Sequence, residues 1–152
     1  MPASVRKVYL DACALHRLLD DQRQPRIRKE AEAVEAIFRL LGTNQVCWVA
    51  GSVLEAEIIR NPDLQKREGA LALLQFANEQ PLLTTSVINR AASLEQAGYG
   101  SFDALHLAIA EEAGADVLLT TDDRFLRQAQ RGQGNPAIPV MNPLNWLQER
   151  KP

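Results

Sequence analysis

Acidic residues that could bind a metal ion stand at four widely separated points of the chain. They are Asp11, Glu55 or Glu57, Asp103, and Asp122 or Asp123. Three of these points follow apolar runs typical of buried strands, and Asp103 stands at the start of an expected helix. A single carboxylate in such a place is usually a solvated loop residue. Several can converge, however, because the strand ends of a parallel sheet open on one edge.

The segment 99–125, YGSFDALHLAIAEEAGADVLLTTDDRF, predicts how two of these points are brought together. Ser101 is a suitable N-cap, apolar residues follow at helical spacing, and Gly114 is placed where a glycine ends a helix. The apolar residues 117–119 then predict a buried strand. In a βαβ unit the helix runs antiparallel to the strands, so we expect Asp103 and Asp122 at the same edge of the sheet.

Carboxylates gathered in this way call for a cation between them. Mg²⁺ and Mn²⁺ prefer oxygen ligands and leave positions open for phosphate and water. Because the candidate set contains no His or Cys, it suits these hard ions better than zinc. The sequence therefore predicts a Mg²⁺ or Mn²⁺ site.

The remaining elements predict one α/β domain over residues 1–152, with a mainly parallel sheet. We expect strands at 8–10, 46–50 and 138–141, the last at an edge because it contains a proline. Helices are expected over 27–41, after Gly51-Ser52, from Asp63, from a cap at Ser86 and from Asn142-Pro143. A short extended piece is expected at 82–85.

The composition narrows the class of protein. A net charge of −2 argues against a DNA-binding module but little against a nuclease, whose metal ions change the local field. We find neither a long apolar run nor a signal peptide, and expect a cytoplasmic protein. Cys13 and Cys47 are expected to be reduced and buried.

Four motifs resemble those of the PIN-domain ribonucleases, the superfamily that includes the VapC-type toxins of toxin–antitoxin pairs. They are VYLDACAL with Asp11, SVLEAEI with Glu57, SFDALHLAIA with Asp103 and LLTTDDRFL with Asp122. The resemblance implies a three-layer fold, a central mainly parallel sheet flanked by helices, and metal-dependent cleavage of RNA. It favours Glu57 over Glu55 and Asp122 over Asp123, since these fit the spacing of the family motifs.

The resemblance also suggests roles. Asp11 and Asp103 would be the core ligands of one or two Mg²⁺ or Mn²⁺ ions, with Glu57 and Asp122 completing the site. Asp123 could assist the metal site or cap a helix over 124–131. The chain departs from the family at Cys13, where many relatives have Ser or Asn, and at Arg124, where relatives often have another acid.

Several other residues are candidates for binding RNA or a partner. Arg124, Arg127 and Arg131 share a helix beside the site and could contact phosphates. A second set, Arg60, Lys66 and Arg67, could do the same, although solvated helix faces are common. The first set is favoured because its helix leaves the metal edge directly. Thr120 could orient a carboxylate or a water. His16 and His106 are more readily explained as exposed or core residues than as bases. Trp48 and Trp146 are expected to pack in the core or at an interface. The resemblance suggests a homodimer, for which Leu18, Leu19 and Phe38 are candidates.

Two rival interpretations remain. A phosphoryl-transfer enzyme with an aspartate nucleophile would generally have a second aspartate at position 13, where this chain has cysteine. A catalytically silent PIN-like module that binds RNA or a partner would not need to bind Mn²⁺. A metal titration separates that module from a nuclease, whereas the sequence does not show whether an antitoxin exists.

Overall fold

A four-stranded parallel sheet forms the centre of the protein in the computed structural model, which describes residues 5–150 (without the Arg150 side chain). The strands are β1 (Arg6–Leu10), β2 (Val46–Val49), β3 (Val117–Leu119) and β4 (Val140–Met141), in the order β2-β1-β3-β4. Tyr9 pairs with Val49 on one side and Leu118 on the other. The two central strands, β1 and β3, are therefore the ones that end on Asp11 and just before Asp122.

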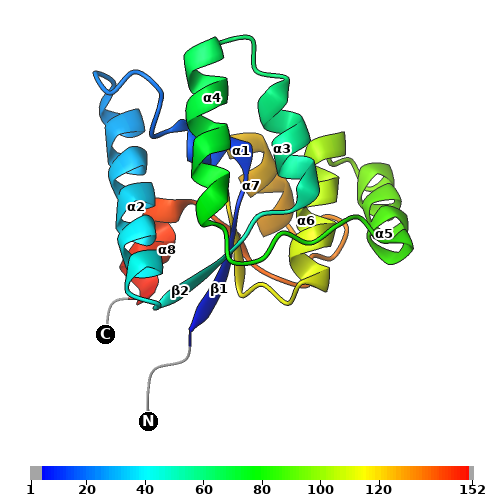
Figure 1. Cartoon of the computed structure of the whole chain (residues 1–152). Helices are drawn as coiled ribbons and strands as arrows, with labels where there is room; N and C mark the ends of the chain where they lie inside the picture. Colours follow the sequence, from blue (N-terminus) through cyan, green and yellow to red (C-terminus); the bar gives the residue numbers. More distant parts are fainter. Residues whose placement is uncertain (1–4, 151–152) are drawn as a thin grey trace.

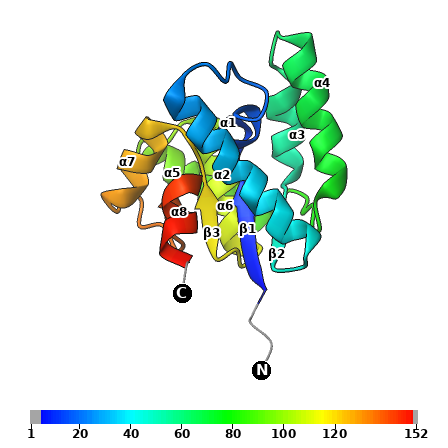
Figure 2. The same ribbon diagram turned by 90° about the vertical axis from the view of Figure 1, so that its left-hand side faces the viewer.

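Helices cover both faces of this sheet (Figures 1 and 2). They are α1 (Ala12–His16), α2 (Pro25–Gly42), α3 (Ser52–Ile59), α4 (Leu64–Leu73), α5 (Thr85–Gln96), α6 (Ser101–Glu112), α7 (Asp123–Gln130) and α8 (Pro143–Arg150), with a 3-10 turn at Leu74–Phe76. Residues of α1, α2, α4 and α8 pack on one face, and residues of α5, α6 and α7 on the other. The predicted α/β architecture, helices flanking a parallel sheet, is confirmed.

The core follows from the alternation of side chains along the strands. In β1, Val8 and Leu10 point to the α2 side while Tyr9 points to the α6 side. In β3, Leu118 shares the Tyr9 side. Because both faces are covered, every residue of β3 is buried, as expected for a parallel sheet. Trp48 and Trp146 lie in the α2-side core, as predicted.

The predicted helix starts are wrong by one or two residues at three places. Gly100, not Ser101, is the N-cap of α6. Thr84, not Ser86, caps α5, and its hydroxyl accepts the N–H of Val87. Asp122, not Asp123, caps α7. At each place two candidate capping residues stand close together, and the packing of the helix decides which one is used.

Two further expectations are corrected at strand level. The last strand covers only Val140–Met141, since the residues before it form bends. Leu82–Thr84 forms no strand. The earlier residue Glu79 instead forms backbone hydrogen bonds with the end of β2. Among the described residues, no helix is long and apolar enough to cross a membrane. The terminal residues 1–4 and 151–152 of the expected domain lie outside the described residues.

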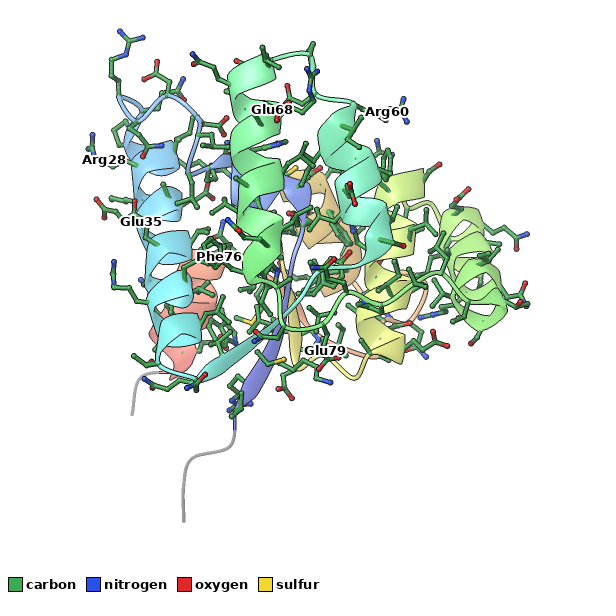
Figure 3. All side chains as sticks on the ribbon, in the orientation of Figure 1. Arg28, Glu35, Arg60, Glu68, Phe76 and Glu79 are labelled. Atoms are coloured by element: carbon green, nitrogen blue, oxygen red, sulfur yellow. The ribbon has the colours of Figure 1, made fainter. Side chains whose placement is uncertain are left out.

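The carboxyl ends of β1, β2 and β3 define the edge of the sheet that matters for function. Above it in Figure 1, α1 follows β1, and α3 leaves the end of β2. The start of α6 faces the same edge because α6 runs antiparallel to the strands. Charged side chains such as Arg28, Glu35 and Glu68 instead project from the outer faces of α2 and α4 (Figure 3).

Candidate active site

Asp11 is buried at the end of β1, with 2% of its surface exposed. It is the N-cap of α1, and its Oδ1 accepts the N–H of Ala14 at 3.0 Å. Burial raises the pKa of Asp11 to about 6. The positive field of His106 and hydrogen bonds from Thr120 and Ala14 oppose this rise, and the charge of Glu57 adds to it. The sequence places an acid here, and the fold keeps it away from water.

Asp103 lies in the first turn of α6. Burial is the largest cause that raises its pKa to about 7; the negative charges of Asp11, Asp122 and Glu57 act in the same direction, and His106 opposes them. No described side chain hydrogen-bonds or ion-pairs with the Asp103 carboxylate. A half-buried acid that faces other acids and has no cationic partner is the arrangement that a bound cation would relieve.

The four predicted acids therefore reach one region although they come from four segments. The Cys13 thiol lies in the field of all four acids: burial and then the charges of Asp11, Glu57, Asp122 and Asp103 raise its pKa. Cys13 is half-buried, so the expectation that it is fully buried is wrong. The only sign in the sequence that Cys13 lies beside the acids is its position two residues after Asp11.

Glu57 lies on α3 and contacts a histidine. Its Oε1 is 2.7 Å from Nε2 of His106, and Nδ1 of His106 is 2.5 Å from the Tyr9 hydroxyl. Glu55, in contrast, is exposed on another face of α3. His106 and Tyr9 are both fully buried, so His106 is a hydrogen-bonded core residue, one of the two alternatives considered for it. Sequence reasoning did not find Tyr9, because a tyrosine in a strand is ordinary.

Thr120 is fully buried at the end of β3. Its hydroxyl oxygen accepts the N–H of Asp122 at 3.1 Å, and its proton is directed to Asp11. The Thr120 hydroxyl thus contacts the Asp11 carboxylate and the backbone of Asp122. Because Thr120 is fully buried, it leaves no surface for RNA.

The four carboxylates are oxygen donors of the kind that a divalent ion requires. Four carboxylates with no arginine or lysine partner among the described residues suit a hard ion such as Mg²⁺ or Mn²⁺. As the side chains stand, no three Asp, Glu, His or Cys within residues 5–150 are arranged so that they could hold a metal. The chemistry of the donors fits the ion, and binding requires the carboxylates to move closer together.

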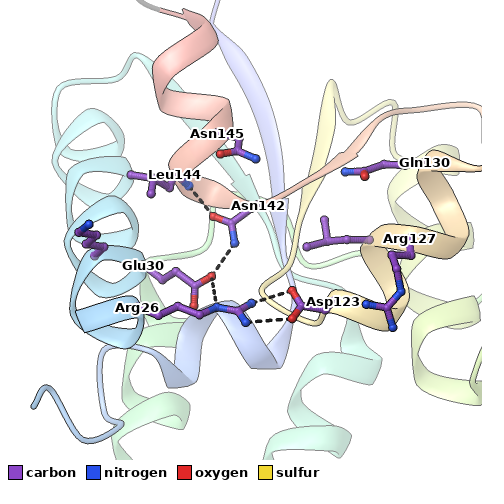
Figure 4. A pocket seen from close by; sticks show the side chains of 10 residues that line it. Arg26, Glu30, Asp123, Arg127, Gln130, Asn142, Leu144 and Asn145 are labelled. Carbon is purple, nitrogen blue, oxygen red and sulfur yellow. Dashed lines mark hydrogen bonds and ion pairs between the residues drawn. The ribbon is translucent and has the colours of Figure 1, made fainter. Parts of the chain in front are cut away.

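Asp122 and Asp123 differ in what they contact. The Asp122 carboxylate accepts the N–H groups of Arg124 and Phe125 at the start of α7. Asp123 points to the other side, into a pocket of about 350 Å³ between α2, α7 and α8 (Figure 4). There it accepts two hydrogen bonds from Arg26, at 2.7 and 2.9 Å. Asp123 is therefore neutralised by a cation, whereas Asp122 adds to the negative field at Asp103.

This difference gives a prediction. Asp122→Asn keeps the N-cap, since asparagine caps as well as aspartate, and we expect it to weaken Mn²⁺ binding about 10-fold or more. Asp123→Asn is expected to leave Mn²⁺ affinity unchanged and to cost at most about 1 kcal/mol of stability, because its pair with Arg26 is exposed. Titration calorimetry of both variants checks this, and equal losses of affinity would contradict it.

The predicted RNA-binding arginines lie on or next to α7. Arg124 and Arg127 are exposed, and Arg127 lines the same pocket as Asp123. Arg60, at the end of α3 (Figure 3), lies with its guanidinium 5.5 Å from the centre of the Phe102 ring, next to Asp103. Arg60, one of the second set of basic residues considered for phosphate binding, is thus held over the residue that precedes Asp103.

Other candidates lie away from the acids or pack differently than expected. Cys47 is half-buried with its thiol near Glu79. His16 is half-buried, and its Nε2 has no hydrogen-bond partner in the described part of the chain. The candidate dimer residues Leu18, Leu19 and Phe38 are half-buried and pack against the α2-side core.

Comparisons with known proteins agree with this arrangement. The structure is similar to a chain of VapBC2 from Rickettsia felis bound to a DNA fragment from its promoter, with 13% identity, a TM-score of 0.59, and coverage of 90% of this chain and 98% of that one. It is also similar to PAE2754 from Pyrobaculum aerophilum, with 15% identity, a TM-score of 0.55, and coverage of 96% and 88%. No curated protein matches the chain by sequence. The PIN domain profile matches residues 8–130, which include all four acids, and the chain therefore belongs to the PIN domain family.

Proposed function

We propose that the protein is a Mg²⁺- or Mn²⁺-dependent endoribonuclease that hydrolyses RNA phosphodiester bonds. The observation that supports this most is the convergence of Asp11, Glu57, Asp103 and Asp122 in a PIN domain. Burial and neighbouring acids raise the pKa of Asp103 to about 7. Keeping unpaired acids together in this way costs stability, which is a common feature of catalytic sites.

Each acid has a role in this proposal. Asp11 and Asp103 are the core ligands, and Glu57 and Asp122 complete the site directly or through water. A bound divalent ion lowers the pKa of a water nucleophile and stabilises charge on the phosphate. Thr120 holds the Asp11 carboxylate in place, and the N-cap hydrogen bonds hold Asp11 and Asp122 at the sheet edge.

The substrate is bound, in this proposal, by cations around the acidic edge. Arg124 and Arg127 on α7 contact the RNA backbone, and Arg60 is placed to contact it from α3. The net charge of −2 makes such local cations necessary, because the protein as a whole does not attract a polyanion.

The proposal is tested with purified protein and a set of labelled single-stranded and structured RNAs. We expect internal cleavage with Mg²⁺ or Mn²⁺, none after EDTA treatment, and recovery when Mn²⁺ is added back. A heat-inactivated sample controls for contaminating nuclease only partly, so the Asp11→Asn variant purified in parallel is the stricter control. Cleavage that persists in EDTA would overturn the proposal.

A catalytically silent PIN domain that binds RNA or a partner is the alternative. It is disfavoured because all four acids are present and unpaired by Arg or Lys within the described residues. Titration with Mn²⁺ separates the two functions: a silent module is expected to show no saturable Mn²⁺ binding that depends on Asp11 and Asp103.

The partners are also proposals. The structural similarity to a VapBC2 chain supports a toxin that is neutralised by an antitoxin. Expressing the protein in cells with and without the product of the neighbouring reading frame tests this. The cells should grow only when both are expressed together. A homodimer is supported by the exposed apolar residues Leu82, Leu83 and Ile88 near the start of α5. Light scattering that shows a strict monomer would exclude it.

A further inference from the structure

The hydrogen-bonded chain Tyr9–His106–Glu57 connects the core of the protein to one of the four acids. It joins β1, α6 and α3, which are far apart in the sequence: Tyr9 and His106 are separated by 97 positions, and His106 and Glu57 by 49. Tyr9 and His106 are fully buried, whereas the Glu57 side chain retains 26% exposure. The three hydrogen-bonded side chains therefore connect two fully buried residues to a carboxylate that is partly exposed and can reach a ligand.

The chemistry of the three groups defines the direction of one hydrogen bond. The Glu57 carboxylate can only accept, so Nε2–H of His106 donates to it. Nδ1 of His106 then either accepts from the Tyr9 hydroxyl or, in the imidazolium form, donates to it. In both cases the imidazole presents the same N–H to Glu57.

The packing around these residues prevents the imidazole from turning away. The ring centroids of Tyr9 and His106 are 5.3 Å apart, and the Phe102 ring stacks on His106 with centroids 6.4 Å apart. Gly51, at the start of α3, leaves space for the Tyr9 hydroxyl: a Cβ there would lie 3.1 Å from that oxygen. The turn before α3 is thus fitted to Tyr9.

We propose that Tyr9 and His106 are positioning residues that hold the Glu57 carboxylate in one orientation toward the other three acids, ready to bind the divalent ion. This rests on the proposed metal-dependent function and deepens it. A free glutamate side chain has many rotamers, and restricting it before the ion binds reduces the entropy lost on binding. Hydrogen-bond partners of metal-binding groups typically change metal affinity 10–100-fold.

The experiment measures the Mn²⁺ dissociation constant by titration calorimetry and by the electron paramagnetic resonance signal of free Mn²⁺. His106→Leu is expected to weaken binding about 10–100-fold. His106→Gln, whose amide has both a donor and an acceptor, is expected to restore most of this loss. Tyr9→Phe removes only the hydroxyl and should give a smaller loss of the same sign.

Tyr99→Phe is the matched control. Tyr99 is also a buried tyrosine with a bonded hydroxyl, 2.7 Å from the Gln133 carbonyl, and it packs on Phe125. It does not contact any of the four acids, so we expect an unchanged Mn²⁺ affinity. If His106→Leu does not fold, the comparison of Tyr9→Phe with Tyr99→Phe decides, and equal affinities for the two overturn the inference.

A double-mutant cycle shows whether His106 changes Mn²⁺ affinity through Glu57. If His106 acts through Glu57, then His106→Leu should have no further effect on Mn²⁺ binding in a Glu57→Gln protein. Full additivity would overturn the inference while leaving the proposed nuclease intact. Absence of any Mn²⁺ binding by the wild-type protein would instead overturn the proposed function, and this inference with it.

Discussion

Replacing Asp11 with asparagine is expected to lower the rate of RNA cleavage about 10³-fold while the protein remains folded. Asp11 has two roles that this change separates. As the N-cap of α1 it accepts the N–H of Ala14, and asparagine performs that role about equally well. What is lost is the negative charge that we propose binds the metal ion, so the expected Mn²⁺ affinity falls as well.

Asp63→Asn is the control for this variant. Asp63 is the N-cap of α4, where its Oδ1 accepts the N–H of Lys66 at 3.1 Å, and its charge is not among those that shift the pKa of Asp11 or Asp103. The same chemical change at an equivalent helix position should therefore leave cleavage and Mn²⁺ binding unaltered. Single-turnover cleavage of an end-labelled RNA measures both variants. Wild-type cleavage by Asp11→Asn would refute the assignment of Asp11.

In the absence of divalent metal, the stability of the protein is expected to fall as the pH rises from about 4 to about 7. The pKa of Asp103 is raised from 3.8 to about 7 in the folded protein. Between these values the folded state retains a proton that the unfolded state has lost, so a rise in pH favours unfolding. Asp11, with a pKa raised to about 6, contributes with the same sign.

Asp103→Asn isolates this effect from other titrating groups. His16, for example, has a pKa lowered by burial and acts in the opposite direction near neutral pH. At pH 8 without metal, we expect Asp103→Asn to be more stable than the wild type by about 2 kcal/mol, after allowance for the partial exposure of Asp103. At pH 4 the two proteins should be about equally stable.

At pH 8, metal binding should make the wild type more stable than Asp103→Asn, the reverse of the order expected without metal. Mn²⁺ at about 100 times its dissociation constant adds about 2.7 kcal/mol to the stability of a protein that binds it only when folded. The wild type should gain this, and Asp103→Asn should gain little. Urea unfolding followed by circular dichroism measures the free energy of unfolding of both proteins, in EDTA and in Mn²⁺. A wild type more stable than the variant in EDTA at pH 8 would contradict the prediction.

Local patterns in the sequence were sufficient to predict most of the elements. Apolar residues at helical spacing ending at Gly114, followed by Val117–Leu119, correspond to α6 and β3 as observed. Gly114 has a φ of 72°, a conformation that glycine adopts without strain. Such features depend on a few neighbouring residues, so they can be recognised without knowledge of the fold.

Helix caps were predicted less well, although they are also local. At 122–123 two aspartates compete for one capping position. Asp122 takes it because Asp123 is drawn to Arg26 of α2, 97 positions away. Both residues can cap a helix, and they differ in that the Arg26 side chain of α2 reaches Asp123 across the pocket (Figure 4).

The sequence by itself determined that acids from four segments lie at the sheet edge, because strand ends and helix starts in an α/β fold have predictable places. The choice of Glu57 over Glu55 and of Asp122 over Asp123 came from the family motifs. Only the tertiary structure decided what each acid contacts: His106 for Glu57, the Thr120 hydroxyl for Asp11, and Arg26 for Asp123. The physical reason is that periodicity specifies which face of an element a residue occupies. Partners from distant segments depend on how whole elements pack, and no pattern within one segment contains that information.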